Sequence, residues 1–246
     1  MHEEDLAIGI DLGGTNTDFG IVDRSGKVLW RGGIKTKNHK EISSYLEELF
    51  LAMLPIIEHA GGVSRIKGIG VGAPNGNFYK GTIEHAPNLA WKGVIPMAQL
   101  MEEKFGLEVV LTNDANAAAI GEMVYGAARD MKDFILITLG TGVGSGIVAN
   151  GKLIYGHDGF AGELGHTMII PDGRYHPGTG LYGSLEMYAS ATGLTKTAIE
   201  MLQKSSAGSS LLHNYTEDEI TSKLVYECAM KGDILSKEVY AYTGKI

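Results

Sequence analysis

Two short segments of this 246-residue chain repeat one pattern, in which an apolar run ends at a glycine-rich turn and a second apolar run follows. The first is Leu12-Gly13-Gly14-Thr15 followed by Gly20-Ile21-Val22, and the second is Leu139-Gly140-Thr141-Gly142 followed by Gly146-Ile147-Val148. Short apolar runs bounded by glycine are typical of buried strands. A strand–turn–strand unit that occurs twice favours a duplicated fold with two lobes. Hairpins also attract glycine for local reasons, so the two matches alone leave both interpretations open.

The rest of the chain alternates short apolar runs with amphipathic stretches. Residues 41–60 carry apolar side chains at helical spacing, and Gly61-Gly62 provides a stop. By the same criteria, the predicted strands are 6–11, 18–23, 28–32, 66–71, 109–111, 134–139 and 145–148, and the predicted helices are 41–60, 96–105, 115–125, 185–202, 216–230 and 234–242. Strands that alternate with helices predict an α/β fold.

Composition excludes several classes of protein. The net charge of −8 argues against nucleic-acid binding, which needs a basic face. The single cysteine, Cys228, excludes both an internal disulfide framework and a cysteine-rich zinc site. No apolar run approaches the ~20 residues that span a bilayer, and the acidic start of the chain lacks the features of a signal peptide. We therefore expect a soluble cytoplasmic protein that binds neither nucleic acid nor membranes.

The first glycine turn has the chemistry of a phosphate-binding loop. In Gly13-Gly14-Thr15-Asn16 the missing side chains let backbone N–H groups approach a phosphate, and Asp11 at the strand end is suited to hold Mg²⁺ beside it. An ordinary hairpin is the alternative for this turn taken alone. The second turn, Gly140-Thr141-Gly142, shifts the balance to function, because two such turns could hold a triphosphate from both sides. Neither turn fits the standard phosphate-loop or dinucleotide-binding motifs.

A carboxylate follows the predicted strand that ends near residue 111. Asp114 stands at a strand-to-helix corner, where it could accept a proton from an attacking hydroxyl group. Phosphoryl transfer requires positioning and charge stabilisation more than covalent help from the protein. Asp114 or Asn113 could equally serve as the N-cap of the following helix, and the local sequence leaves that alternative open.

A third group of polar residues lies in the second half of the chain. Glu163, His166 and Glu186 are planar polar side chains of the kind that bind the neighbouring hydroxyls of a sugar. A metal site is the rival interpretation, since His157, His166 and His176 occur in the same region. Their spacing matches no standard zinc pattern.

Taken together, these segments resemble the ROK family (repressor, open reading frame, kinase) of sugar kinases, within the actin-like ATPase superfamily. The resemblance covers nearly the whole chain in the family's order, and it rests on Asp11-Leu12-Gly13-Gly14-Thr15, Thr112-Asn113-Asp114-Ala115-Asn116, Leu139-Gly140-Thr141-Gly142-Val143-Gly144 and Glu163-Leu164-Gly165-His166. Gly72-Ala73-Pro74 and Asn88-Leu89 also resemble sugar-pocket loops, especially those of bacterial glucokinases.

The resemblance implies a role for each matching residue. Asp114 would be the general base that deprotonates a sugar hydroxyl. The implied sugar ligands are Asn88, Asn113, Glu163, His166 and Glu186. The implied ligands of ATP and its Mg²⁺ are Asp11, Gly13, Gly14, Thr15, Asn16, Gly140, Thr141 and Gly142.

The chain departs from the family in two places. Family members carry Cys-x-Cys-Gly-x-x-Gly-Cys-x-Glu, whose cysteines join the histidine of Glu-x-Gly-His around a structural zinc ion. Pro177, Thr179 and Ser184 stand at the cysteine positions here, so we predict no structural zinc and expect the 175–182 loop to orient His166 instead. Family members also continue beyond the segment that ends this chain, so we expect a truncated C-terminal lobe with an open adenosine pocket.

These features predict an α/β protein with a two-lobed actin-like ATPase (ribonuclease H-like) fold and a central cleft. Residues 1–114 would form the N-terminal sugar and phosphate lobe, and residues 115–246 the incomplete C-terminal nucleotide and sugar lobe. The predicted function is ATP-dependent phosphorylation of a hexose, foremost glucose, at the 6-hydroxyl, and the family resemblance implies a homodimer. Polyphosphate stays open as an alternative donor.

Two alternatives belong to other functional classes. The first is a non-catalytic sugar-binding or regulatory member of the family, inactive because its nucleotide lobe is truncated. The second is a sugar-responsive repressor, which needs an N-terminal helix-turn-helix. The few residues before the Leu6 strand leave no room for one, so we do not expect DNA binding.

Overall fold

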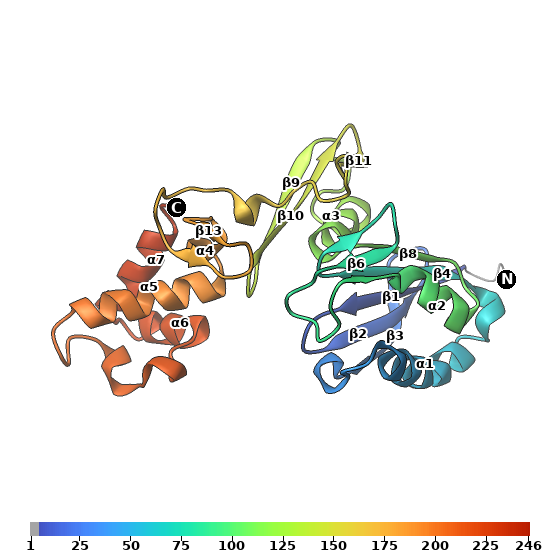
Figure 1. The fold of residues 1–246 in the computed structure, drawn as a ribbon, viewed down its shortest axis with the longest axis horizontal. Helices are drawn as coiled ribbons and strands as arrows, with labels where there is room; N and C mark the ends of the chain where they lie inside the picture. The colour runs from blue at the N-terminus through green and yellow to red at the C-terminus, as the bar shows by residue number, and fades with distance from the viewer. Residues whose placement is uncertain (1–4) are drawn as a thin grey trace. The chain divides into compact units, whose positions relative to one another are not determined.

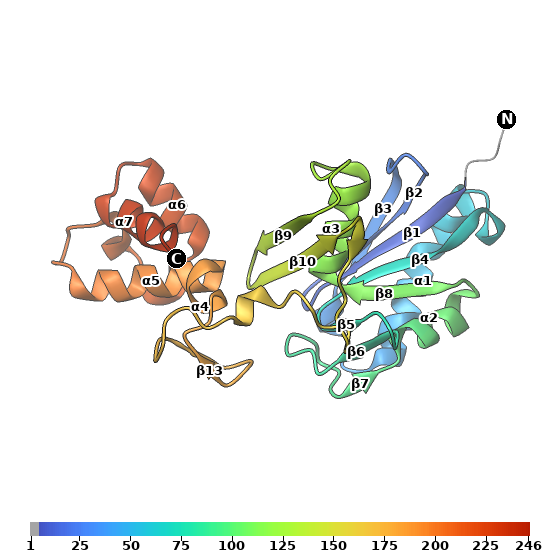
Figure 2. The same ribbon diagram turned by 90° about the horizontal axis from the view of Figure 1, so that it is seen from above.

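The computed structural model describes residues 5–246, which divide into two compact units (Figures 1 and 2). Unit 1 comprises the chain up to Leu136 together with Gly146–Gly162, and unit 2 comprises Ile137–Ser145 and Glu163–Ile246. The mixture of helices and strands confirms the predicted α/β class. The boundary at residue 114 was predicted for the two ligand-binding lobes, which are defined by function and not by compactness. It stays a prediction.

A five-stranded sheet forms the centre of unit 1, in the order β3-β2-β1-β4-β8. Its strands are β1 (Leu6–Leu12), β2 (Thr17–Val22), β3 (Val28–Ile34), β4 (Ile66–Ala73) and β8 (Val109–Asn113). Strands β1, β2 and β3 pair antiparallel through tight turns, whereas β4 and β8 run parallel to β1 because helical segments precede them. All five strands were predicted, with ends that differ by up to two residues.

Helices cover both faces of this sheet. Helices α1 (Ile42–His59) and α2 (Met97–Phe105) share one apolar core with the buried residues of β1, β4 and β8. Helix α3 (Asp114–Tyr125) packs against β4 on the opposite face, as Figure 1 shows. Alternate residues of β1 are buried, among them Ile8 and Ile10, as expected for a strand with one face on the main core.

Smaller strands complete unit 1. Strands β5 (Gly76–Asn77), β6 (Thr82–Glu84) and β7 (Val94–Ile95) form a three-stranded sheet in the region that lacks a clear sequence period. Strands β9 (Phe134–Leu139) and β10 (Val143–Ala149) each belong partly to unit 1 and partly to unit 2, and β11 (Lys152–Leu153) pairs with β10. Two 3₁₀ turns, η1 (Thr36–Asn38) and η2 (Val63–Arg65), lie in loops of unit 1.

Unit 2 is mostly helical. Its helices are α4 (Glu186–Ala189), α5 (Ala191–Lys204), α6 (Ser222–Met230) and α7 (Ile234–Thr243), with 3₁₀ turns η3 (Leu164–His166), η4 (Leu211–Asn214) and η5 (Glu217–Glu219). Buried apolar residues of α5, α6, α7 and η4 form its core, among them Ala198, Val225 and Val239. A hairpin of β12 (Tyr175–His176) and β13 (Leu181–Tyr182) precedes α4.

Two predicted helices differ from the structure. The helix predicted at 185–202 is broken at Ser190, whose buried hydroxyl donates to the Glu186 carbonyl group and accepts the Gly193 N–H, so that one serine ends α4 and caps α5. The helix predicted at 216–230 begins only at Ser222. Thr216 and Glu219 close a separate capping box around η5, and Thr221 caps α6.

Arg174 fastens the hairpin to the helices of unit 2. Its guanidinium group donates two hydrogen bonds of 2.8–2.9 Å to the Glu200 carboxylate and further bonds to Thr197 and to the carbonyl groups of Met187 and Gly193. The guanidinium carbon also lies 4.5 Å from the centre of the Tyr188 ring. The planar arginine fork therefore joins β12 to both α4 and α5.

No helix within residues 5–246 is both long enough and apolar enough to cross a lipid bilayer.

We predict that Arg174→Ala lowers the free energy of unfolding by about 2–4 kcal/mol, because it removes several charge-assisted hydrogen bonds from a guanidinium group whose side chain is only 12% exposed. Arg174→Lys should recover less than half of this loss, since lysine keeps the charge but not the fork. Urea unfolding followed by far-UV circular dichroism measures both effects. An alanine variant within about 0.5 kcal/mol of the wild type would contradict the role of Arg174.

Candidate active site

The parallel pairing of β1, β4 and β8 brings their carboxyl ends to one edge of the sheet in unit 1. Asp11 pairs with Gly72, and Ala73 pairs with Asn113, so Asp114 follows at the same edge. Asp18 lies opposite Asp11 on the antiparallel strand β2. The carboxyl edge of a parallel sheet is where α/β proteins place their ligands.

The first glycine turn packs against the segment that carries Asn88. The Gly13 N–H donates to the Asn16 carbonyl oxygen at 2.9 Å and closes the turn. A Cβ atom at Gly14 would lie 2.5 Å from the Asn88 carbonyl oxygen, so only glycine fits at this position. The structure therefore brings a predicted phosphate ligand and a predicted sugar ligand into direct contact. Lys35, which the sequence analysis did not identify, donates to the Asn16 side chain at 2.7 Å.

Asn113, and not Asp114, is the N-cap of helix α3. The Asn113 side-chain oxygen accepts the Ala115 N–H at 2.8 Å, which is the capping bond. Asp114 is the first helical residue; one of its oxygens also lies 2.8 Å from the Ala115 nitrogen, and its side chain is exposed. This resolves the alternative left open by the sequence, because capping the helix does not require Asp114.

Three carboxylates share this part of unit 1. Partial desolvation, followed by the charges of Asp114 and Asp18, raises the pKa of Asp11 above its ordinary value, even though the Asp11 side chain is exposed. Like charges held together in this way favour binding of a cation. Carboxylate oxygens are the ligands that Mg²⁺ prefers, so Asp11 fits the predicted role beside a nucleotide phosphate.

In unit 2 the second glycine turn lies against the start of helix α5. The Gly140 N–H donates to Gly142, and the Gly140 carbonyl oxygen accepts the Ala191 N–H at 2.9 Å. The Thr192 hydroxyl donates to the Thr141 carbonyl oxygen at 3.0 Å. The turn is shorter than predicted, since β10 already begins at Val143.

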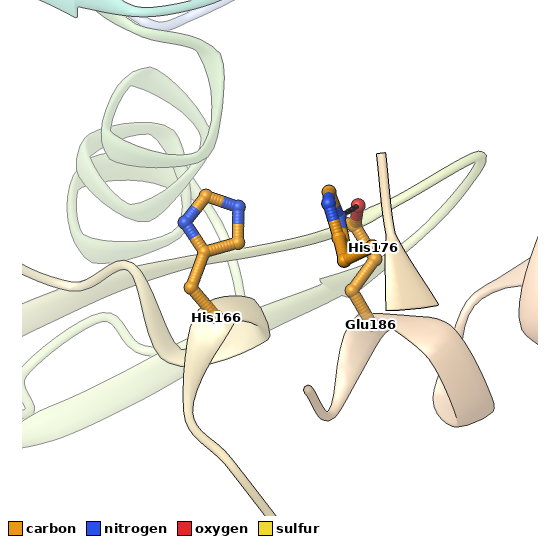
Figure 3. Close-up of side chains that lie close together, drawn as sticks. All are labelled: His166, His176 and Glu186. Atoms are coloured by element: carbon orange, nitrogen blue, oxygen red, sulfur yellow. Dashed lines mark hydrogen bonds and ion pairs between the residues drawn. The ribbon is translucent and has the colours of Figure 1, made fainter. Parts of the chain in front are cut away.

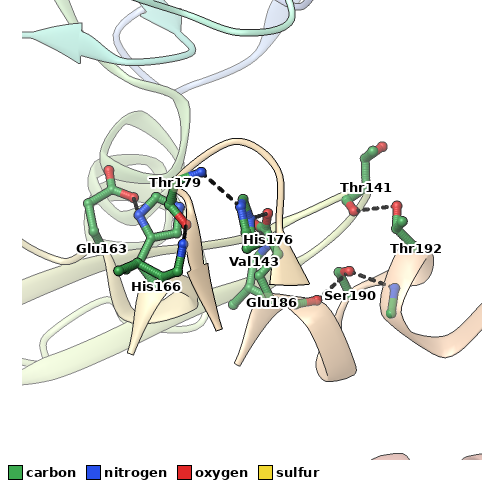
Figure 4. A network of polar contacts seen from close by, with 11 residues as sticks. Thr141, Val143, Glu163, His166, His176, Thr179, Glu186, Ser190 and Thr192 are labelled. Carbon is green, nitrogen blue, oxygen red and sulfur yellow. Dashed lines mark hydrogen bonds and ion pairs between the residues drawn. The ribbon is translucent and has the colours of Figure 1, made fainter. Parts of the chain in front are cut away.

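Glu186 connects this turn to the hairpin of unit 2 (Figure 4). Its Oε2 accepts the Val143 N–H at 2.8 Å, and its Oε1 lies 2.6 Å from Nε2 of His176. A Cβ atom at Gly142 would collide with Oε2, so glycine is needed for the carboxylate to reach the turn. Glu186 is therefore held by hydrogen bonds to both of its oxygens.

Glu163 precedes the 3₁₀ turn η3, and His166 is its last residue. Oε2 of Glu163 lies 4.0 Å from Nδ1 of His166, and both side chains are partly exposed. The His166 ring makes an edge-to-face contact with the His176 ring at 5.5 Å between centres, so the 175–182 loop contacts His166, and its role in orienting His166 stays a prediction. Unit 2 thus brings the predicted sugar ligands Glu163, His166 and Glu186 together around the second glycine turn.

The same residues form a possible metal-binding group. Atoms of His166, His176 and Glu186 that could bind a metal lie within 4.8 Å of one another (Figure 3). However, Nδ1 of His176 accepts the Thr179 N–H at 3.1 Å, which leaves the proton of the neutral ring on Nε2. A metal ligand needs a free lone pair there. With Pro177, Thr179 and Ser184 at the family's cysteine positions, the donor set does not fit a structural zinc ion.

Sequence reasoning missed the part that His176 plays. His176 appeared only as one of three histidines in the rival metal interpretation. Of the other two, His166 lies beside His176, whereas His157 is 97% exposed and does not belong to the group of His166, His176 and Glu186. The signal that could have identified it is its place beside the lost cysteine positions, ten residues before Glu186.

Comparisons with known proteins identify the family to which the chain is similar. A sequence model of the ROK family matches residues 7–246. The glucokinase of Halalkalibacterium halodurans is 36% identical over 234 residues, which are 94% of this chain and 71% of that protein. The xylose repressor of Caldicellulosiruptor bescii is 34% identical over 229 residues, which are 92% of this chain and 56% of the repressor.

Solved structures give the same result. A ROK family glucokinase from Streptomyces griseus, in complex with glucose and AMPPNP, matches with a TM-score of 0.76 and 34% identity, over 96% of this chain and 74% of its own. The chain therefore spans between 56% and 74% of the length of these three relatives.

We predict that Asp11→Asn is at least as stable as the wild type at pH 7. The raised pKa means that ionising Asp11 costs stability as the pH rises from its ordinary value of 3.8 through the raised one. Below pH 3.8 the variant and the wild type should have the same Tm. Above the raised pKa of Asp11 the variant should have the higher Tm, and Mg²⁺ should reduce this difference in Tm by stabilising the wild type. Thermal unfolding across pH measures this. If the Tm of the variant minus the Tm of the wild type were lower at pH 7 than at pH 3, the result would contradict this assignment.

We also predict that purified protein carries substoichiometric zinc and that EDTA leaves its Tm unchanged, because the residues at the hairpin do not offer a zinc donor set. Elemental analysis by mass spectrometry measures the zinc content. One zinc ion per chain, lost in His166→Ala, would show that the donor argument is wrong.

Proposed function

The chain belongs to the ROK family and has its actin-like ATPase type of fold, and from this premise we propose that it transfers the γ-phosphoryl group of ATP to the 6-hydroxyl of a hexose, foremost glucose. The observation that carries the proposal is the state of Asp114. It lies at the carboxyl edge of the sheet, exposed, while the neighbouring Asn113 caps the helix. A carboxylate at that position is available to act as a base.

The proposed reaction needs one proton acceptor. As the sugar oxygen forms its bond to the γ-phosphorus, its hydroxyl proton passes to the Asp114 carboxylate, and the bond between the γ-phosphorus and the bridging oxygen breaks to release ADP. The Gly13 and Gly140 N–H groups close their own turns, so the backbone N–H groups of Gly14 and Thr15 in the first turn, and of Thr141 and Gly142 in the second, are the ones proposed to bind phosphate. When bound at Asp11, Mg²⁺ would neutralise charge on the phosphate oxygens.

Each unit carries residues that the family resemblance implies as sugar ligands. Asn88 and Asn113 are the proposed ligands in unit 1. Contact between Gly14 and Asn88 supports this assignment, because it places the Asn88 segment beside the phosphate turn. Glu163, His166 and Glu186 are the proposed ligands in unit 2, where they surround the second glycine turn. The relative from Streptomyces griseus that was solved with glucose supports glucose as the first substrate to test.

We further propose that the protein acts in the cytoplasm as a homodimer and supplies hexose phosphate to carbohydrate breakdown. Support for this comes from the family resemblance.

A second candidate function is sugar-dependent regulation without catalysis. Its support is that the chain is 34% identical to the xylose repressor, which is close to its 36% identity with the glucokinase. The two candidates differ in what they require of Asp114, since a sugar sensor needs hydroxyl recognition but no base. Phosphoryl transfer from ATP to the bound sugar separates them.

We predict that Asp114→Asn lowers kcat for glucose phosphorylation by about 10²–10⁴-fold, because the amide cannot accept the proton, while the glucose dissociation constant changes little. A coupled assay gives kcat, and calorimetric titration gives the affinity. Asp18→Asn is the matched control, since it removes a neighbouring carboxylate without removing the base. Near-normal turnover by Asp114→Asn would refute the assignment.

We predict that glucose gives the highest kcat/KM in a panel of glucose, mannose, fructose, N-acetylmannosamine and xylose, with ATP preferred over polyphosphate as donor. A site that binds each hydroxyl group with a polar side chain discriminates strongly against sugars that lack one. Binding of xylose without phosphorylation of any hexose would favour the regulatory candidate instead.

A further inference from the structure

We propose that His176 is the residue that positions Glu186 for the sugar, so that a histidine–carboxylate pair, without a metal ion, sets the orientation of this ligand. The inference rests on the proposed function, because it takes Glu186 to be a sugar ligand. It concerns a residue to which neither the family resemblance nor the comparisons give a role.

The first step is the protonation state of the His176 ring. His176 lies in β12 and is only 8% exposed, so its hydrogen bonds are shielded from water. Its Nδ1 accepts the backbone N–H of Thr179 at 3.1 Å. A backbone N–H only donates, so Nδ1 must carry the lone pair, and the neutral ring carries its proton on Nε2.

The second step is what that proton does. Nε2 lies 2.6 Å from Oε1 of Glu186 and donates its proton to this oxygen. The Val143 N–H occupies Oε2 from the other side at 2.8 Å. With one donor fixed on each oxygen, the carboxylate plane cannot rotate, and a second lone pair on each oxygen is left to accept a sugar hydroxyl.

The third step is why the ring itself stays in place. The Tyr175–Tyr182 pairing closes the hairpin. The Thr179 N–H is shared between Nδ1 of the His176 ring at 3.1 Å and the His176 carbonyl oxygen at 3.3 Å, and the Gly180 N–H donates to the same carbonyl oxygen at 2.9 Å. The His166 ring packs edge-to-face on the His176 ring. His176 therefore fixes Glu186 through a hydrogen bond and contacts His166 through its ring, which links two proposed sugar ligands to one hairpin.

Two substitutions of His176 separate positioning from structural support. In His176→Asn the side-chain oxygen keeps an acceptor near the place of Nδ1 but does not reach Glu186. In His176→Gln the longer side chain returns an N–H donor near the place of Nε2. Both variants remove the imidazole ring to a similar degree, so a difference between them reports on the bond to Glu186.

We expect His176→Asn to raise KM for the hexose by about 10–100-fold, because a charge-assisted hydrogen bond to a partly buried carboxylate is lost. KM for ATP should stay within about 2-fold of wild type, since the backbone of the glycine turns is unchanged. His176→Gln should recover most of the hexose KM. Unchanged hexose KM in His176→Asn would overturn the proposal, and so would equal impairment of both variants with a matching fall in Tm, which would show structural support only.

Nuclear magnetic resonance of the wild-type protein tests the pair without relying on activity. Long-range proton–nitrogen correlations of His176 should show the proton on Nε2, and Glu186→Gln should shift that nitrogen signal. A proton on Nδ1, or a metal-bound nitrogen, would overturn the inference. If the wild type neither binds nor phosphorylates any hexose, the proposed function fails, and the role of the His176–Glu186 pair in sugar binding fails with it. If the wild type phosphorylates a hexose and the hexose KM rises in His176→Asn but not in His176→Gln, the result supports both the proposed function and the positioning role of His176.

Discussion

The parallel pairing of β1, β4 and β8 is the constraint on which the rest of unit 1 depends. Strands that run in one direction must end at one edge, so the pairs Asp11–Gly72 and Ala73–Asn113 bring residues from three distant parts of the chain together. The buried faces of the strands fix this register, because a shift by one residue would turn Ile8 and Ile10 away from α1 and α2. The position of Asp114 is therefore a result of core packing far from the site.

In unit 2, polar contacts instead of a sheet hold the Glu186 side chain in position. Glu186 accepts one hydrogen bond from the glycine turn at Val143 and one from His176 in the hairpin. Ser190 then ends the short helix that carries Glu186 and starts α5, whose first residues bond to Gly140 and Thr141. The turn, the carboxylate and the helix start therefore form one connected network of hydrogen bonds (Figure 4).

Much of this could be predicted from sequence, and the failures have physical causes. The strands of the main sheet and helices α1, α2, α3 and α7 follow local periodicity, and the structure confirms them. The break at Ser190 was missed because a serine inside an amphipathic stretch shows its capping role only when its hydroxyl finds Gly193. His176 was missed because its importance comes from the tautomer that Thr179 imposes, which no spacing rule contains. The roles of the site residues toward ligands stay predictions, and the choice between Asn113 and Asp114 as cap needed coordinates.

The contact of Gly14 with Asn88 has an evolutionary consequence. Because any side chain at Gly14 would displace the Asn88 backbone, the loop proposed to bind the sugar and the turn proposed to bind the phosphate cannot move apart by a single substitution at Gly14. Substitutions that change the sugar preference are therefore expected at residues outside this contact. A laboratory selection for new sugars should leave Gly14 untouched and accumulate its changes elsewhere.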